Sequence, residues 1–415
     1  MSGNAESFFE WERFPSALKH EIVSGYLTNA FPVLLQHFKK DVVYADLFAG
    51  AGRYEDGRPG SPLIAADLAL RWSAGGASTR VRCFNVEANP VFFNQLQTNT
   101  AAYPPGMVTN RPGRWEEHFG ELERLMRGLP AIVFMDPFRL DVPLEAIADL
   151  VQQIGTEARD LILMFNVHGL QRIVHAKAAE DLRRRDASVD LDGSPTAPVS
   201  NYFQKPNAVL GGRWWQDLLL DGKLPETRFA DVVEGYCDQL RRIGSKDGKA
   251  ARRALGVPIP YKLGGSTSYY LVLVTRSPKA VVLFSDAADE AISEAWHRRE
   301  EEERLEHRPP EAFVPLFSED QLPPSLGSTY ELRREPLLKE MPAEIVEYVE
   351  RLNWLPSLRE VHEMLAMRHC GLFRWTHVTR LARELHDAGE IELVPKRIGP
   401  YTRLLPRSIS QKLHA

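Results

Sequence analysis

The fold of this 415-residue chain is decided by one stretch, Tyr44-Ala45-Asp46-Leu47-Phe48-Ala49-Gly50-Ala51-Gly52. Apolar residues from 42 to 45 predict a buried parallel strand that ends at Asp46. Gly50 and Gly52 then alternate with alanine, and glycine permits backbone angles and a close ligand approach that any Cβ would block. The stretch therefore predicts a turn against which a nucleoside with charged groups can lie. Taken alone, the same pattern also fits a purely structural turn.

A second acidic residue follows the next predicted strand. Residues 80–86 are predicted as the second strand, which ends at Glu87, where a carboxylate can accept hydrogen bonds from two ribose hydroxyls. The connection before this strand is long and contains Gly60-Ser61-Pro62, a helix start with serine as cap and proline at the first helical position. Ser61 is interpreted as a cap or as a cofactor contact, and Glu87 as a ribose ligand or as a solvated strand end.

A third acidic residue ends the predicted central strand. Residues 130–135 are apolar almost throughout, as in a strand buried on both faces, and they lead into Asp136-Pro137-Phe138. In an open α/β sheet, ligands bind beyond the carboxyl ends of the strands. Asp136 and the two earlier acidic residues are therefore expected to face one crevice. The alternative is that Asp136 is only a buried loop carboxylate.

Composition places the chain among ordinary globular proteins. It is 44% hydrophobic and 26% charged, with a net charge of -5, and its length favours two or three domains. The three cysteines, Cys83, Cys237 and Cys370, are scattered, so neither a disulfide framework nor a metal site is expected. The N-terminus lacks the pattern of a signal peptide and no run is long enough to span a bilayer, which predicts a cytoplasmic protein.

Hydrophobic periodicity predicts an α/β fold, with a mostly parallel Rossmann-like sheet and an antiparallel last strand. A small helical domain follows a stretch rich in proline, serine and acidic residues. The predicted parts are an α/β domain at 1–305 with a covering helix at 15–40 and an insertion near 178–260, paired strands at 268–275 and 280–284, a linker at 306–340, and a C-terminal domain at 341–408.

The C-terminal domain has the plan of a winged helix. Three helices are predicted from residue 341 to residue 388, and the second opens on the capping box Ser357-Leu-Arg-Glu360. Strands at 390–394 and 401–405 then form a hairpin, and three helices with a β-hairpin define a helix-turn-helix variant. Such domains bind nucleic acid or mediate protein contacts.

Two groups of basic residues could engage phosphates. One lies in the run from 241 to 253, predicted as a loop or short helix that projects from the sheet, and the other lies on the last helix and the hairpin. Either group also fits a solvated surface. The basic residues expected to contact nucleic acid are Arg241, Arg242, Lys249, Arg252, Arg253, His377, Arg380, Arg383, Lys396 and Arg397.

Residues from about 40 to 290 resemble a class I S-adenosylmethionine-dependent methyltransferase domain. The stretch from 46 to 52 matches its first motif, Glu87 its ribose-binding acid, and Asp136-Pro137-Phe138 its catalytic-region motif. Taken whole, with the Gly-Ser-Pro at 60–62 and the winged-helix tail, the chain resembles the three-Cys-motif partner family of bacteria. The resemblance implies S-adenosylmethionine as cofactor and a partner protein with three cysteines in a radical-S-adenosylmethionine-like spacing. The cofactor-binding residues that it implies are Asp46, Phe48, Gly50, Gly52, Ser61 and Glu87.

The resemblance also implies an acceptor chemistry. In amine methyltransferases that act on bases, the acid and the proline carbonyl of such a motif accept hydrogen bonds from the target amine, and the aromatic ring stacks on the base. The resemblance gives these roles to Asp136, Pro137 and Phe138. With Arg139 the motif reads Asp-Pro-Phe-Arg, which is nearer to Asp-Pro-Phe-Gly of tRNA guanine dimethyltransferases than to Asp-Pro-Pro-Tyr. The resemblance thus implies a methyltransferase acting on a base amine of DNA or RNA.

Two other classes of function remain open on the sequence alone. The first is a non-catalytic adaptor, in which the methyltransferase fold is a scaffold and the C-terminal domain recruits the partner or DNA. The second is a nicotinamide-dependent dehydrogenase, which the sequence favours less because the glycine loop lacks a third spaced glycine.

Overall fold

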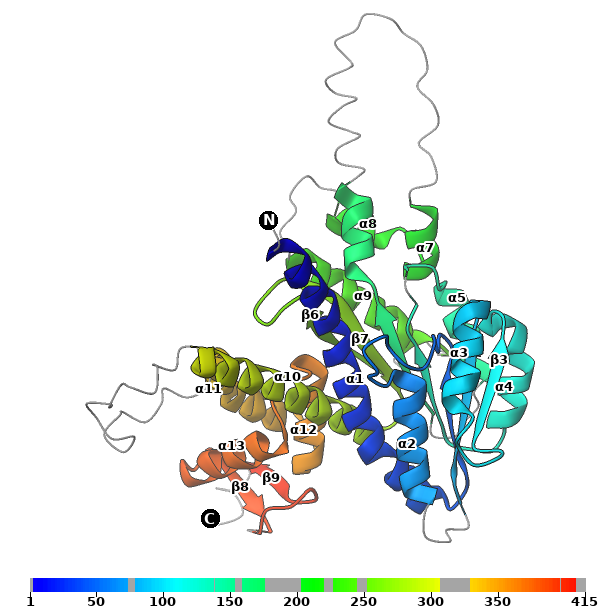
Figure 1. Cartoon of the computed structure of the whole chain (residues 1–415). Helices are drawn as coiled ribbons and strands as arrows, with labels where there is room; N and C mark the ends of the chain where they lie inside the picture. Colours follow the sequence, from blue (N-terminus) through cyan, green and yellow to red (C-terminus); the bar gives the residue numbers. More distant parts are fainter. Residues whose placement is uncertain are drawn as a thin grey trace, which may run out of the picture. The chain divides into compact units, whose positions relative to one another are not determined.

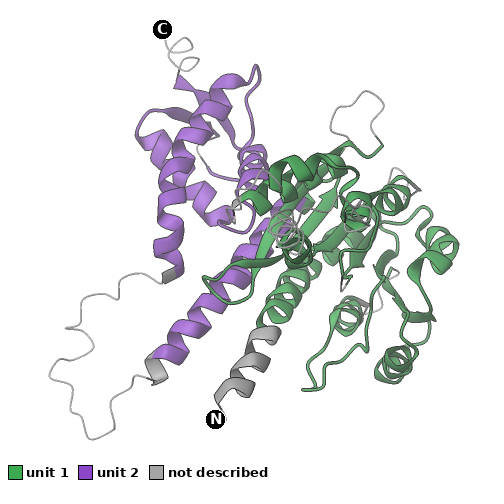
Figure 2. Cartoon of the chain, turned by 90° about the horizontal axis from the view of Figure 1, so that it is seen from above, with its two compact units in different colours: residues 1–280 green, residues 281–415 purple. Residues whose placement is uncertain are grey.

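The computed structural model describes residues 3–73, 79–137, 139–153, 159–175, 203–219, 227–244, 252–306, 329–395 and 397–407. The chain divides into two units, residues 1–280 and residues 281–415, which are coloured separately in Figure 2. Within the described ranges, no helix is both long enough and apolar enough to cross a lipid bilayer. Phe138, Lys249 and Lys396, all predicted site residues, lie outside the described residues.

The N-terminal unit is built on a seven-stranded mixed sheet (Figure 1). Its strand order is β3-β2-β1-β4-β5-β7-β6, in which the first five strands are parallel and β7 runs antiparallel to both β5 and β6. The chain thus passes outward from β1 to β3, returns beside β1 with β4, and continues outward on the other side. The strands are β1 Val42–Asp46, β2 Val81–Glu87, β3 Val108–Pro112, β4 Ala131–Met135, β5 Arg159–Phe165, β6 Arg253–Pro260 and β7 Thr267–Thr275.

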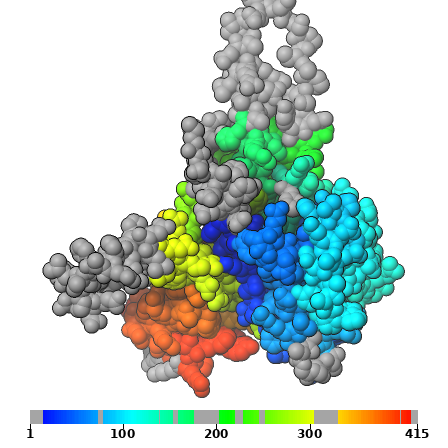
Figure 3. All heavy atoms as spheres, viewed as in Figure 1, coloured from blue at the N-terminus to red at the C-terminus, as the bar shows by residue number. Residues whose placement is uncertain are grey.

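Helices cover both faces of this sheet. One face carries α1, whose Phe31 ring meets Tyr44 of β1 edge-on, together with α2 and α3. Atoms of α1 (dark blue) are visible beside those of α2 in the space-filling view (Figure 3). The helices of the N-terminal unit are α1 Gly3–Phe38, α2 Ser61–Ser73, α3 Pro90–Thr100, the short η1 Trp115–His118, α4 Phe119–Met126, α5 Leu144–Gln153, residues 167–175, α7 Gln204–Leu210, α8 Trp214–Leu219 and α9 Thr227–Arg242.

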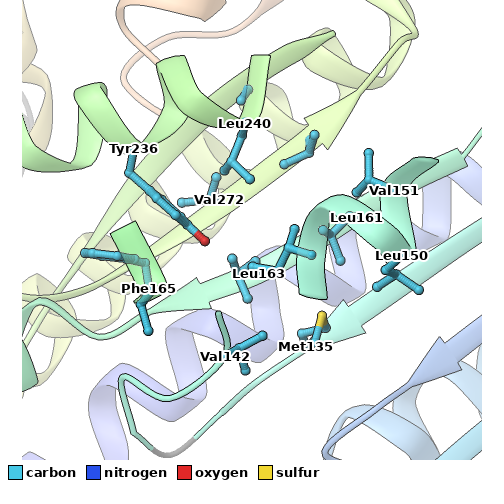
Figure 4. Close-up of a cluster of buried hydrophobic side chains, with 14 of the residues drawn as sticks. Met135, Val142, Leu150, Val151, Leu161, Leu163, Phe165, Tyr236, Leu240 and Val272 are labelled. Carbon is cyan, nitrogen blue, oxygen red and sulfur yellow. The ribbon is translucent and has the colours of Figure 1, made fainter. Parts of the chain in front are cut away.

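The opposite face holds the main hydrophobic core. Alternate residues of the central strands, such as Leu161 and Leu163 of β5, point toward α4, α5 and α9, as period-two strands require. Tyr236 of α9 packs on Phe165 with ring centroids 4.9 Å apart, and Leu240 lies further along the same helix (Figure 4). This core fixes the strands in position, so that the residues at their carboxyl ends are held by a rigid platform.

Two predictions about the end of the sheet are wrong. Residues 280–284 are helical, within α10 Pro278–Glu306, because Val281, Phe284 and Ala288 recur at helical spacing and are buried. The strand that pairs with β7 is instead β6. Residues 227–260, predicted to belong to an insertion, supply α9 and β6 and are thus part of the sheet and its covering layer.

The C-terminal unit contains four helices and a β-hairpin among its described residues. They are α10, α11 Thr329–Arg351, α12 Leu358–Arg368, α13 Trp375–Asp387, β8 Ile391–Val394 and β9 Arg403–Pro406. The capping box predicted at the start of α12 is present, with Ser357 and Glu360 bonded reciprocally. The prediction of a linker is wrong for residues 329–340, because these residues form the first half of α11.

A buried ionic cluster explains why α10 groups with the C-terminal unit, although residue 305 was the predicted boundary. Asp289 of α10 is fully buried and accepts hydrogen bonds from Arg334 (2.8 Å), Arg374 (2.7 Å) and Tyr330 (3.0 Å). Arg334 also pairs with Glu331. The carboxylate therefore joins α10 to α11 and to the start of α13.

Replacing Asp289 with asparagine is expected to destabilise the protein by on the order of 3 kcal/mol, because the buried Arg334 guanidinium loses one of its two counter-charges and the ion pair of Arg374 with Asp289 is lost as well. Urea unfolding followed by circular dichroism measures the change. The matched control is Glu290→Gln, which removes the same charge from the exposed neighbouring position. Equal effects of the two substitutions would contradict a role for the buried pair.

Candidate functional site

The loop after β1 is fixed by its neighbours on both sides. The Leu47 N–H donates to the Phe134 carbonyl of β4 at 3.0 Å, and the Ala49 N–H donates to the Val86 carbonyl of β2 at 3.0 Å. Since β2, β1 and β4 are adjacent in the sheet, these bonds extend the ladder past the end of β1. The loop residues are consequently held between the ends of the two flanking strands.

Glu87 supports this loop and keeps room for a ligand. Its Oε2 accepts the Gly50 N–H at 2.7 Å, and its Oε1 accepts the Asn89 N–H at 2.6 Å. The residue is 8% exposed. A carboxylate offers about four lone-pair positions, so each oxygen retains one after these bonds. Glu87 thus joins the end of β2 to the glycine loop and can still accept hydroxyl donors.

The two glycines of the loop have different roles. Gly50 has φ +61°, and a Cβ built there meets nothing within 4 Å, so the space beside it is open. Gly52 has φ +78°, and a Cβ there would approach Leu63 Cδ1 to 2.6 Å and Leu96 Cδ1 to 3.0 Å. Gly50 therefore leaves space against the main chain for a ligand, whereas Gly52 allows α2 and α3 to pack against the loop.

Substitutions at the two glycines are expected to separate binding from stability. Gly52→Ala combines a strained backbone with a side-chain clash and is expected to destabilise the protein by about 1–3 kcal/mol. Gly50→Ala carries only the backbone strain, about 1 kcal/mol, but places a methyl group in the open space. Urea unfolding and calorimetric titration with cofactor measure the two effects. A Gly50→Ala protein with unchanged affinity would show that this space is not used.

Asp46 is the most deeply buried acid of the site. It has no exposed surface, its Oδ1 accepts the Phe48 N–H at 3.2 Å, and its carboxylate is hydrogen-bonded by the Ser61 side chain. Burial raises the pKa of Asp46 to about 7, against the lowering effect of these two bonds. Ser61 is thus a partner of Asp46 at the start of α2. The Phe48 ring packs on the hydrophobic core.

Asp136 is paired with a residue that the sequence analysis missed. Lys19 of α1 donates from Nζ to Asp136 Oδ2, and the two side chains are 5% and 26% exposed. Burial works to lower the pKa of Lys19, but the charge and hydrogen bond of Asp136, together with Tyr54 and Asp46, raise it, and the net shift is upward. Lys19 is therefore an ammonium ion at neutral pH, held at the carboxyl end of β4.

A signal for Lys19 is present in the sequence. Lys19, Ile22, Val23 and Tyr26 follow one another at helical spacing, and all four are buried, so a lysine occupies the apolar stripe of α1. The same face of the helix is anchored by Tyr26, which donates to Asp160 of β5 at 2.6 Å. A lysine on a stripe that faces a sheet requires an acidic partner there.

Three aromatic side chains lie within electrostatic range of Lys19. Tyr54 of the loop after β1 is 40% exposed and lies within electrostatic range of both charges, as does Tyr269 of β7. The His20 ring is tilted against Tyr54 at 5.6 Å. Burial, followed by the charges of Lys19 and Arg58, lowers the pKa of His20 well below its usual value, so this imidazole is neutral. Pro137 is buried directly after Asp136.

The basic run from 241 to 253 does not form a projecting loop in its described part. Arg241 pairs with Glu234 and Asp238, each at 2.6 Å, and donates to the Ala254 carbonyl. Arg252 is 8% exposed and donates to the Val151 carbonyl at 3.0 Å.

Arg241 thus links α9 to β6, and Arg252 links the start of β6 to α5. Both guanidinium groups are engaged in hydrogen bonds that hold the fold together. Arg253 opens β6 and donates to the Arg276 carbonyl at 3.0 Å, and Arg242 is exposed at the end of α9.

The basic residues of the C-terminal unit remain on its surface, with one exception. Arg380 and Arg383 are exposed on α13, where Arg380 lies 3.7 Å from Glu384, and Arg397 is exposed in the hairpin turn. His377 instead accepts the Arg374 N–H at 3.1 Å with its Nδ1, as part of the cap of α13. Tyr401, which the sequence analysis did not select, is 77% exposed in the same turn.

The described residues contain no group of three or more metal-ligating side chains. Their fit to a nucleoside cofactor is tested by three features: the open space at Gly50, the unused acceptor positions of Glu87, and the buried Asp46 between them. All three lie at the carboxyl ends of β1 and β2, where α/β sheets bind ligands. The residues therefore fit such a group.

The strand order, with β7 antiparallel between β5 and β6, defines a class I methyltransferase-like Rossmann fold. No family model matches the chain, and no curated protein matches its sequence. Solved structures with a distant likeness include the O-methyltransferase TomG from Streptomyces achromogenes, involved in tomaymycin synthesis and solved in complex with SAM. It shares 13% identity at a TM-score of 0.31, covering 61% of this chain and 78% of that chain.

Two further structures show a similar degree of likeness. An O-methyltransferase from Bacillus cereus in complex with SAH shares 11% identity at a TM-score of 0.30, covering 61% of this chain and 80% of that one. A dimethyladenosine transferase from Plasmodium falciparum shares 6% identity at a TM-score of 0.26, covering 86% of this chain and 96% of the other. These likenesses concern the fold alone.

Proposed function

We propose that this protein is an S-adenosylmethionine-dependent methyltransferase that acts on a base amine of nucleic acid. The observation that carries the proposal is the convergence of Asp46, Glu87 and Asp136 at the carboxyl ends of the adjacent strands β1, β2 and β4, beside the open space at Gly50. The strand order is the one typical of class I methyltransferases.

Each residue of the cofactor side has a separate task. Glu87 accepts hydrogen bonds from the two ribose hydroxyls with its free lone pairs. Gly50 allows the ligand to lie against the main chain. Asp46 in its ionised form binds the ammonium group of the methionyl part. When bound, S-adenosylmethionine supplies an electrophilic methyl group on a sulfonium ion.

On the acceptor side, Asp136 accepts an N–H of the target amine and directs the nitrogen lone pair toward the methyl group. The nitrogen–carbon bond forms as the carbon–sulfur bond breaks, the electron pair of the broken bond remains on sulfur, and the amine proton leaves to the carboxylate or to water. Because the sulfonium ion is already reactive, positioning supplies most of the acceleration. Phe138, proposed to stack on the base, lies outside the described residues.

We further propose that the C-terminal unit is a winged-helix domain that holds the nucleic acid. Helices α11, α12 and α13 followed by the β8–β9 hairpin have that plan, and α13 presents Arg380 and Arg383 to solvent. Arg397 and Tyr401 in the hairpin turn add a charge and an exposed ring, a combination suited to phosphates and bases. A three-Cys-motif protein is the proposed partner.

The test has two stages. Isothermal titration with S-adenosylmethionine and with its demethylated product is expected to show saturable binding that Glu87→Gln weakens by about tenfold or more. Tritium transfer from labelled cofactor is then measured with separate pools of DNA, tRNA and protein, and label is expected in a nucleic-acid pool. Absence of binding heat with both ligands refutes the cofactor assignment, and label only in protein refutes the acceptor assignment.

The Lys19–Asp136 pair favours a second candidate function, a non-catalytic adaptor. A carboxylate already bound to an ammonium ion is less available to a target amine than a free carboxylate. In an adaptor, α13 would bind nucleic acid or the partner while the N-terminal unit transfers no methyl group.

Arg383→Glu is expected to weaken binding of a fluorescein-labelled DNA or RNA duplex by about tenfold and to reduce its salt dependence, because one phosphate contact is lost. Fluorescence anisotropy at several salt concentrations measures both effects. Arg351→Glu, at an exposed position on α11, is the matched control. If both variants bind like the unmodified protein, α13 is not the nucleic-acid surface.

A further inference from the structure

The Lys19–Asp136 pair places a hydrogen-bond donor beside an acceptor at the proposed acceptor site. An ammonium ion has three N–H donors, and Lys19 uses one of them on Asp136 Oδ2. Among the described residues, Lys19 makes no other hydrogen bond, and Asp136 is partly exposed at 26%. The pair therefore has unused donors on the lysine and unused lone pairs on the carboxylate.

The position of Lys19 is fixed by the structure. Tyr26, two turns further along the same face of α1, is hydrogen-bonded to Asp160 of β5, and Leu18 and Ile22 on either side of Lys19 are buried. The lysine therefore cannot swing away from the end of β4 without disturbing the packing of α1. Its ammonium group is a permanent feature of the site.

We propose that Lys19 is a specificity-determining residue that, together with Asp136, recognises an exocyclic amine and the unprotonated ring nitrogen beside it. The inference rests on the proposed function. Asp136 accepts from the amine, and Lys19 donates to the ring nitrogen. Adenine, cytosine and the N2–N3 side of guanine present this edge. On the Watson–Crick edge of guanine, the N1–H and the N2 amine are adjacent donors. This edge is disfavoured, because the N1–H would point at the N–H donors of the Lys19 ammonium group.

The charges of the pair agree with this assignment. Lysine and aspartate neutralise one another, so the site offers no net negative charge to a protonated amine such as a lysine side chain. Binding of a neutral aromatic amine does not depend on a net negative charge at the site, because such an amine is recognised by hydrogen bonds. Tyr54 and Tyr269 lie within electrostatic range of both charges, so two aromatic residues are present in the vicinity of the pair.

The experiment is a cycle that combines a protein substitution with an atomic substitution in the substrate. The probes are single-stranded thymidine 20-mers with one central dA, dC or dG, and the same oligonucleotides with 1-deaza-dA, 3-deaza-dC or 3-deaza-dG. Tritium transfer from labelled S-adenosylmethionine is measured with the unmodified protein and with Lys19→Met. The all-thymidine oligonucleotide, which has no exocyclic amine, is the blank.

For the base that is methylated, we expect the deaza substitution to lower kcat/KM by about 10- to 100-fold, the value of a hydrogen bond to a charged donor. Lys19→Met is expected to lower it by a similar factor, and the two changes together by no more than either alone. A purely structural lysine would give independent effects that multiply. Lys39→Met, at an exposed position just after α1, is the matched control for loss of a charge.

Independent effects of the two substitutions overturn the inference and leave the proposed function intact. The inference is also overturned, and the proposed function stands, if a base is methylated and its deaza analogue is methylated with the same kcat/KM. If no oligonucleotide and no nucleic-acid pool accepts label although cofactor binds, the proposed function fails and the role of Lys19 falls with it. Isothermal titration of Lys19→Met with the cofactor checks that the cofactor side is preserved.

Discussion

Replacing Asp136 with alanine is expected to abolish measurable methyl transfer and, at the same time, to destabilise the protein. Activity falls because the target amine loses the acceptor that orients its lone pair, a change on the order of 10²- to 10⁴-fold. Stability falls by about 2–4 kcal/mol because the Lys19 ammonium, whose side chain is 5% exposed, is left without its counter-charge. Because Asp136 is partly exposed, the expected loss of unfolding free energy lies toward the lower end of the range found when one partner of a buried ion pair is removed.

A double variant separates these two effects. In Lys19→Met with Asp136→Ala, no charge remains uncompensated, and part of the lost stability is expected to return. Methyl transfer is expected to remain absent, since the acceptor is still missing. Tritium incorporation and urea unfolding of all four proteins complete the cycle. If Asp136→Ala retains full activity, the amine-orienting role is wrong and the adaptor function becomes the better proposal.

The acidic strand ends could be predicted from the sequence because their signal is local. Asp46 and Asp136 directly follow apolar runs of the length of a buried strand, and Glu87 follows a predicted strand in which apolar residues alternate with polar ones. Parallel strands place their carboxyl ends at one edge of a sheet. Asp46, Glu87 and Asp136 needed no knowledge of the packing of helices to be selected. Gly50 and Gly52 adopt positive φ angles, which glycine permits and other residues rarely adopt.

The Lys19–Asp136 contact could not be predicted in the same way. Its partners are 117 residues apart, and their meeting depends on the direction in which α1 crosses the sheet. The sequence indicates only that Lys19 lies on an apolar stripe and needs an acidic partner. Which of the acidic residues pairs with it is decided by the anchor of Tyr26 on Asp160.

The misassigned strand has a different cause. Residues 280–284 are apolar and short, and such a run cannot be told from a buried helix segment by periodicity over so few positions. The true partner of β7, β6, was hidden because Arg252 and Arg253 at its start resemble a solvated basic run. Both arginines donate to backbone carbonyls, so their charges are accommodated at the edge of a structured region.

Replacing Asp46 with asparagine is expected to weaken cofactor binding and yet to stabilise the protein without ligand at pH 8. Burial raises the pKa of Asp46 from its ordinary value of 3.8 to about 7, so the folded protein keeps a proton that the unfolded chain has already lost. The folded state binds more protons than the unfolded state between these values. Stability therefore falls as the pH rises from about 4 to about 7, and the full penalty is present above pH 7.

Asparagine does not titrate, so the variant is expected to lose this part of the pH dependence, and its advantage over the unmodified protein should grow from pH 5 to pH 8. Urea unfolding across that interval measures the difference. Asp149→Asn, at an exposed position on α5, is the matched control and should follow the unmodified protein. A constant difference between Asp46→Asn and the unmodified protein would show that Asp46 is already ionised at pH 5.

The same titration predicts how the cofactor affinity depends on pH. If only the ionised Asp46 binds the methionyl ammonium group, the affinity for S-adenosylmethionine should be roughly tenfold weaker at pH 6 than at pH 8, because near pH 6 most of the carboxyl is protonated. 5′-Methylthioadenosine keeps the nucleoside and lacks the amino-acid part, so its affinity should stay constant over this range. Isothermal titration with both ligands makes the comparison within one protein. A parallel loss of affinity for both would place the titrating group on the nucleoside side of the site, since the two ligands share that part and differ in the amino-acid part.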